Sequence, residues 1–118
     1  MPRFVILLHV VSSGEKHWDL MLQQGDVLAT WQVPLPPQQW GAEPINCTKI
    51  FDHRLKYLDY EGQLSENRGQ VSRVEAGCYG RASFGSDCVE VTLDGQQLQG
   101  ELTLIRVEDE RWELTLIC

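Results

Sequence analysis

Residues 4–33 read FVILLHVVSSGEKHWDLMLQQGDVLATWQV, and this segment decides the fold. Its apolar and β-branched side chains fall into three short runs, at 4–11, 17–23 and 27–33. Ser12-Ser13-Gly14 and Gly25-Asp26 separate these runs, and residues of these types mark turns. We therefore predict three strands joined as hairpins, with the first strand paired to the second.

The same pattern continues to the end of the chain. Pro34-Leu35-Pro36-Pro37 ends the third strand, because proline cannot donate a hydrogen bond to a β-ladder. Further extended segments are expected at 45–55, 57–62, 69–76, 89–93, 98–107 and 112–117, the last three as a meander. No long helical period competes, so the spacing predicts an all-β fold, either an antiparallel sandwich or a barrel.

Length and cysteine usage indicate one cytoplasmic domain. The 118 residues suffice for a single domain, 1–118, with a core of its own. The four cysteines form no Cys-x-x-Cys pair and no secretory leader opens the sequence, so we expect reduced thiols in a cytoplasmic protein. The longest apolar stretch, 4–11, is far below the roughly 20 residues of a membrane span, so we expect no membrane partner.

The charge is negative and unevenly distributed. The net charge is −7, with five Lys/Arg against six Asp/Glu in residues 1–60 and five against eleven in residues 61–118. DNA-binding proteins gain most of their affinity from cations at phosphates, so this balance argues against tight, non-specific binding to a duplex. It permits a small, local basic site.

The histidines of the first half are the best candidates for chemistry. His17 and Asp19 project from the same face of one expected strand, and His9 lies on the strand paired with it. Imidazole and carboxylate together suit a divalent transition ion, with positions left open for water or substrate. A two-histidine, one-carboxylate iron oxygenase site is a weaker alternative, and isolated surface or core histidines are the simplest one.

A second group of candidates lies in the 45–55 segment. Strict alternation places Cys47, Lys49, Phe51 and His53 on one face. Lys49 and His53 are therefore expected to contact one ligand, with a solvated surface lysine as the alternative for Lys49.

Several motifs, in order, resemble those of the 3′-phosphoesterase domain of bacterial and archaeal DNA ligase D. They are Arg3-Phe4-Val5-Ile6 running to His9, His17-Trp18-Asp19-Leu20, Trp31-Gln32-Val33-Pro34, Asp52-His53-Arg54-Leu55-x-Tyr57, Asp59-Tyr60-Glu61-Gly62 and the closing hairpin from Leu98 to a tryptophan strand. The resemblance spans nearly the whole chain.

The resemblance implies a compact antiparallel β-barrel with short loops or helical turns. It implies a Mn²⁺ site at His9, His17 and Asp19, with His53 contacting the phosphate. The residues themselves leave Zn²⁺ or another divalent transition metal open as the alternative ion. Catalysis would then depend on His53, His9 and Asp19, and substrate binding on His53, Lys49 and Arg54. The expected activity is release of phosphate or a ribonucleoside from DNA 3′ ends in end-joining repair, alongside a DNA ligase or polymerase.

Four departures from the family pattern support an alternative. Met21, Leu35, Ile45 and Phe51 stand at or beside positions where the family has cations or a glutamate that act on phosphate. Stabilising charge on a transferring phosphoryl group is most of what a phosphoesterase does. A catalytically weak or inactive binding or scaffold module of a repair complex is therefore the second hypothesis.

Overall fold

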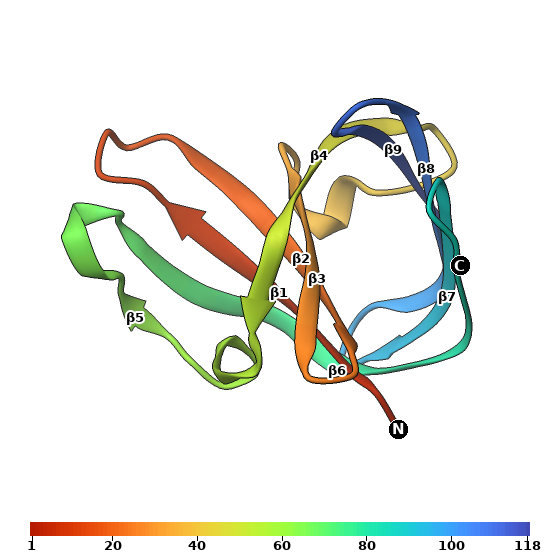
Figure 1. The fold of residues 1–118 in the computed structure, drawn as a ribbon, viewed down its shortest axis with the longest axis horizontal. Helices are drawn as coiled ribbons and strands as arrows, with labels where there is room; N and C mark the ends of the chain where they lie inside the picture. Colours follow the sequence, from red (N-terminus) through yellow and green to blue (C-terminus); the bar gives the residue numbers. More distant parts are fainter.

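The computed structural model describes all 118 residues, and most of its regular structure is β-strand (Figure 1). The strands are β1 (Arg3–Val10), β2 (Lys16–Gln24), β3 (Val27–Val33), β4 (Ile45–Arg54), β5 (Gly62–Gln63), β6 (Gln70–Phe84), β7 (Cys88–Gly95), β8 (Gln99–Glu108) and β9 (Arg111–Ile117). Short 3₁₀ helices, η1 (Pro37–Gln39), η2 (Leu55–Leu58) and η3 (Ser65–Asn67), lie in the connections. The all-β prediction is confirmed.

The strands close into an antiparallel barrel. The order is β1-β2-β3-β4-β9-β8-β7-β6, and β6 pairs back to β1 to complete the ring, while the short β5 pairs with the first residues of β6. Each of these pairs is antiparallel. Closure leaves no long exposed edge in the ring, and it confirms the barrel rather than the sandwich.

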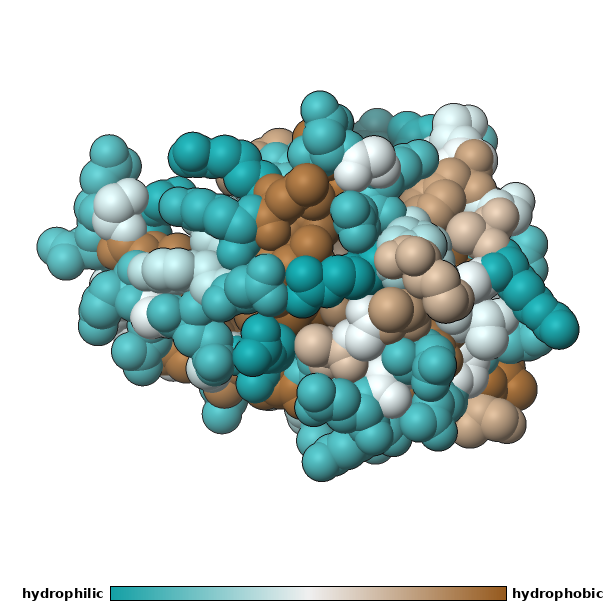
Figure 2. Space-filling model, turned by 90° about the horizontal axis from the view of Figure 1, so that it is seen from below, coloured by the Kyte–Doolittle hydropathy of each residue, from teal (hydrophilic) through white to brown (hydrophobic).

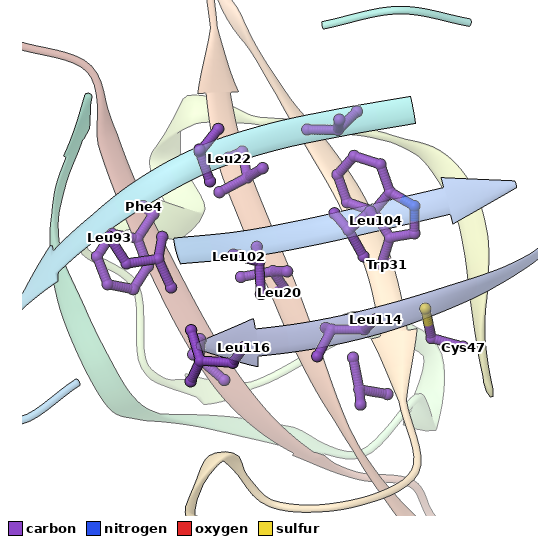
Figure 3. Packing of buried hydrophobic residues seen from close by; sticks show 14 of the residues in the cluster. Phe4, Leu20, Leu22, Trp31, Cys47, Leu93, Leu102, Leu104, Leu114 and Leu116 are labelled. Atoms are coloured by element: carbon purple, nitrogen blue, oxygen red, sulfur yellow. The ribbon is translucent and has the colours of Figure 1, made fainter. Parts of the chain in front are cut away.

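Alternation along β1 and β2 creates two apolar clusters on opposite faces of the barrel wall. Phe4 and Leu20 point inward and join the main core, which Leu102, Leu104, Leu114 and Leu116 complete from the far wall (Figure 3). The neighbouring side chains point outward and form a second, smaller cluster: Val5, Leu7, Met21, Leu28, Leu58 and Val71. The candidate site lies on this outer face.

The expected strand at 57–62 is wrong, because the structure has the helix η2 over Leu55–Leu58 and only the two-residue β5 at Gly62–Gln63. Side chains three residues apart share one face of a 3₁₀ helix, so the turn packs both Leu55 and Leu58 on the outer cluster. Burial of Leu55 and Leu58 outweighs the preference for a strand that the sequence pattern indicated.

Strand β6 is longer than the expected 69–76 segment and runs on to Phe84. Gly77 does not end it, because this glycine lets the backbone of β7 approach. A Cβ at Gly77 would lie 2.2 Å from the carbonyl oxygen of Asp94. The long strand pairs with β1 through its first half and with β7 through its second half, so it joins the two ends of the barrel wall.

The face of the molecule seen in Figure 2 is predominantly hydrophilic, with hydrophobic side chains exposed in patches between the polar ones. The structure contains no helix with the length and apolar character needed to cross a membrane.

Candidate metal centre and adjoining cavity

The pairing of β1 with β2 brings the three predicted metal ligands together. His9 lies directly opposite His17, and Asp19 lies opposite Leu7 in the same register. The two imidazole rings meet edge to face, with centroids 4.7 Å apart. The predicted placement of His9 beside the His17 strand is confirmed.

One potential ligand atom from each of His9, His17 and Asp19 lies within 4.8 Å of the other two. Nδ1 of His17 is 2.8 Å from Oδ1 of Asp19, and Nδ1 of His9 is 3.6 Å from Oδ2. The shorter distance is that of a hydrogen bond, yet both atoms are buried without a hydrogen bond of acceptable geometry. Ligand atoms of one metal ion also lie about 3 Å apart, given metal–ligand distances near 2.1 Å. The cluster could therefore hold a divalent ion.

The charge of the cluster is suited to a cation. Burial by itself would raise the pKa of Asp19, but the adjacent His17 and His9 imidazoles outweigh it and hold that pKa below its ordinary value. Asp19 is therefore an ionised carboxylate at neutral pH. The same contact with Asp19 raises the pKa of His9 above its ordinary value, although burial opposes this.

A backbone contact orients His9. Its Nε2 lies 2.8 Å from the carbonyl oxygen of Arg68, just after η3, so Nε2–H donates to that oxygen and, in the neutral ring, Nδ1 carries the lone pair on the Asp19 side. Metal-ligating histidines commonly donate their other ring N–H to a carbonyl in this way. Arg68 could not be predicted as a site residue, because a contact through a backbone carbonyl 59 residues away leaves no pattern in the side chains.

A cavity of about 310 Å³ opens beside the cluster. His9, Asp19, His53, Arg54 and Arg68 contribute to its lining. It therefore joins two of the candidate metal ligands to a third histidine and to two arginines, which are groups that could bind a phosphate ester.

His53 lines this cavity as a neutral base. Its Nδ1 lies 3.0 Å from the carbonyl oxygen of Phe51 and donates to it, which leaves the Nε2 lone pair free. Burial lowers the pKa of His53 below its ordinary value, although Phe51 and nearby carboxylates act in the opposite direction.

The expectation that Lys49 and His53 share one face is wrong. Opposite Leu28 and Thr30 of β3, strand β4 carries an extra residue between His53 and Ile50, so a β-bulge interrupts the alternation. Lys49 instead turns toward the main core, with Nζ 5.0 Å from the centre of the Trp31 ring and 3.7 Å from Oδ1 of Asp52. It does not line the cavity beside Asp19.

The four residues that depart from the family pattern also differ in whether they line the cavity. Met21 and Phe51 line the cavity, so they replace polar groups with apolar surface inside it. Leu35 and Ile45 do not line it; Ile45 begins β4, opposite Leu114 of β9. Two of the four replacements therefore bear on the cavity.

Fold and site define an all-β barrel protein with a candidate His₂Asp centre beside a partly apolar cavity. Residues 9–106 match the family model of the DNA Ligase D 3′-phosphoesterase domain, so the chain belongs to that family.

Two similar proteins share the name "Multifunctional non-homologous end joining protein LigD". The protein from Mycolicibacterium smegmatis is 25% identical over 124 residues, a match that covers 93% of this chain and 16% of the relative. The protein from Pseudomonas aeruginosa is 27% identical over 112 residues, and this match covers 88% of this chain and 13% of the relative. The chain thus corresponds to a small part of either protein.

Proposed function

We propose that this chain is a divalent-metal phosphoesterase that removes phosphate or a ribonucleoside from DNA 3′ ends in end-joining repair. The observation behind this proposal is a pair of buried atoms, His17 Nδ1 and Asp19 Oδ1, that lack a hydrogen bond, on a cluster whose His9 and Asp19 line the cavity that also contains His53. Membership of the 3′-phosphoesterase family supports the same chemistry.

We assign metal binding to His9, His17 and Asp19, with Mn²⁺ as the proposed ion and Zn²⁺ as the alternative. When bound there, a divalent ion supplies polarisation of a phosphoryl oxygen and a water of lowered pKa. Asp19 contributes the one negative charge of the set, and the Arg68 carbonyl keeps His9 in the liganding orientation.

His53 and Arg54 act on the substrate from the other wall of the cavity. Arg54 attracts the phosphate through its charge. A bound phosphate would favour the protonated form of His53, which then could hold the phosphate or protonate the leaving oxygen. In this assignment His53 and Arg54 bind substrate and do not bind the ion.

The proposal extends to partners through the relatives, which are described as non-homologous end joining proteins of bacteria. We propose that the chain works in the cytoplasm on DNA 3′ ends, alongside a DNA ligase or polymerase.

The experiment measures phosphate release from single-stranded and primer–template DNA with 3′-phosphate or 3′-ribonucleotide ends, with and without Mn²⁺. Calorimetric titration of Mn²⁺ runs in parallel. His9→Ala, His17→Ala and Asp19→Ala should lose both binding and release, whereas His53→Ala should lose release and keep binding. Unchanged Mn²⁺ binding in the first three variants would contradict the metal assignment.

A second candidate function is a binding module without turnover. Met21 and Phe51 favour it, because these apolar residues line the cavity where cations would stabilise a phosphoryl group. In that case Mn²⁺-dependent binding of a 3′-phosphate end would be measurable in the parent, but no phosphate would be released.

A further inference from the structure

Phe51 is the one aromatic residue among the large, exposed apolar side chains of this barrel, with 74% of its surface accessible. Phe4 and the barrel-wall residue Trp31 are buried in the main core. Phe51 lies at the β4 bulge and lines the cavity that contains His9 and Asp19. It is therefore an exposed aromatic ring at the candidate site.

The Phe51 ring stacks in parallel on the His53 imidazole. Its centroid lies 4.9 Å from that of His53, and the two ring planes differ by 4°. His53 covers one face of the Phe51 ring, and the high exposure of Phe51 leaves the opposite face open. A third flat ring could continue this stack.

The cavity has room for one nucleotide. Its volume of about 310 Å³ is at the small end of the 300–1,000 Å³ range of small-ligand pockets. A phosphate near Asp19 and its proposed ion would share this cavity with the Arg54 side chain. Phe51 is the most exposed aromatic ring in the lining of this cavity, so the base of that terminal nucleotide could pack against it.

We propose that Phe51 is the stacking platform for the unpaired terminal base of a DNA strand that ends in a 3′-phosphate. This inference rests on the proposed function and adds the form of the substrate, a single-stranded end that still carries its last base. Stacking on an aromatic side chain tolerates any base, because every base has a π-face. Stacking of the base on Phe51 would thus contribute binding energy in a cavity where Met21 stands in place of a family cation.

The test compares two oligonucleotides, each a single strand with a 3′-phosphorothioate to slow hydrolysis, in Mn²⁺. One ends in 2-aminopurine and the other in an abasic tetrahydrofuran residue. We expect the parent to bind the abasic end at least about fivefold more weakly, and the 2-aminopurine fluorescence to be quenched on binding. Phe51→Ala and Phe51→Leu should remove both effects, and Phe51→Trp should restore them.

Ile105→Ala is the matched control, since Ile105 is also an exposed apolar side chain on a strand but lies on β8 and does not line the cavity. Equal binding of both ends by the parent, with Mn²⁺-dependent binding that His9→Ala removes, would overturn the inference and leave the proposed function in place. Absence of Mn²⁺-dependent binding of either end by the parent would overturn both. Quenching that persists in Phe51→Leu would also overturn the stacking role.

Discussion

At the scale of single residues, the contact between His9 and Asp19 determines how the proposed metal centre responds to pH. Asp19 raises the pKa of His9 above 6.5, and a protonated imidazole cannot bind a metal ion. Affinity for Mn²⁺ should therefore be constant at alkaline pH and fall as the pH drops through that raised pKa. The loss should approach tenfold per pH unit for each proton displaced.

Calorimetric titrations between about pH 5 and about pH 8 check this prediction. His53→Ala is the control, because burial lowers the pKa of that imidazole and we place it outside the ligand set. The variant should show the same pH dependence of Mn²⁺ binding as the parent. Affinity that does not change over this interval would exclude imidazole ligands.

Met21 shows how one residue could limit the reaction. It is buried, lines the cavity, and follows Asp19 by one alternation on β2. Met21→Arg should bind a 3′-phosphate end more tightly, because a guanidinium there could donate two hydrogen bonds to phosphate. Without ligand the variant should be less stable, since the guanidinium is then buried without a phosphate to offset its desolvation.

Thermal melts with and without phosphate check the Met21→Arg prediction, with the volume-conserving Met21→Leu as control. The arginine variant should have the lower melting temperature without ligand and the larger shift with phosphate. Equal shifts in the parent and both variants would show that residue 21 does not act on the ligand.

At the scale of elements, two glycines of the same backbone conformation should differ in their effect on the site. Gly14 and Gly69 have φ of +96° and +95°, but a Cβ at Gly14 would meet nothing within 4 Å, whereas one at Gly69 would lie 2.0 Å from the Val10 carbonyl oxygen. Gly14→Ala should cost about 1–2 kcal/mol of stability from its dihedral angle alone. Gly69→Ala should cost more and displace the Arg68 carbonyl that orients His9.

Denaturant unfolding and Mn²⁺ titration of both glycine variants separate these effects. Gly69→Ala should weaken Mn²⁺ binding by about tenfold, as expected for loss of a group that orients a ligand. Gly14→Ala should leave Mn²⁺ affinity unchanged. Equal affinities in the two variants would show that the Arg68 contact does not hold His9 for the ion.

The turn between β7 and β8 depends on one buried carboxylate. Glu75 accepts hydrogen bonds from the backbone N–H groups of Gln96, Gln97 and Leu98, at 2.9, 2.9 and 2.6 Å. Glu75→Gln turns one acceptor oxygen into a donor that faces these N–H groups, so it should destabilise the fold by about 1–3 kcal/mol. Urea unfolding measures this, and the exposed Glu101→Gln on β8 should have almost no effect.

The same elements show how far the sequence could predict the site. Alternation of side chains placed His17 and Asp19 on one face, and the turn after β1 paired that strand with His9, because both features are local. Alternation failed for Lys49, since a single extra residue in β4 reverses the faces beyond it. Helix η2 was missed because burial of Leu58 on the outer cluster is a tertiary effect.

At the scale of the whole molecule, closure of the barrel could not be predicted from strand patterns alone. The ring closes where β1 pairs with β6, for example Phe4 opposite Gly77, and short-range patterns carry no information on such distant partners. Strand spacing therefore predicted a sandwich or a barrel equally well, and only the family resemblance favoured the barrel. The single-domain prediction for residues 1–118 stays a prediction.

The distribution of charge over the whole molecule should make DNA binding weakly dependent on salt. The net charge is −7, and the cavity lining contributes only Arg54 and Arg68 as lysine or arginine side chains. Contacts with one or two phosphates of a single strand predict a slope of roughly −0.7 to −1.4 for log affinity against log salt concentration. Arg54→Gln should reduce the magnitude of this slope by about 0.7, whereas Arg81→Gln, which changes a residue that is exposed on β6 and outside the cavity, should not change the slope.

Fluorescence anisotropy with a 3′-phosphate oligonucleotide over a range of NaCl concentrations measures the slope. A steep slope, about −4 or beyond, would show that many phosphates along the strand are bound and that recognition is not confined to the 3′ end.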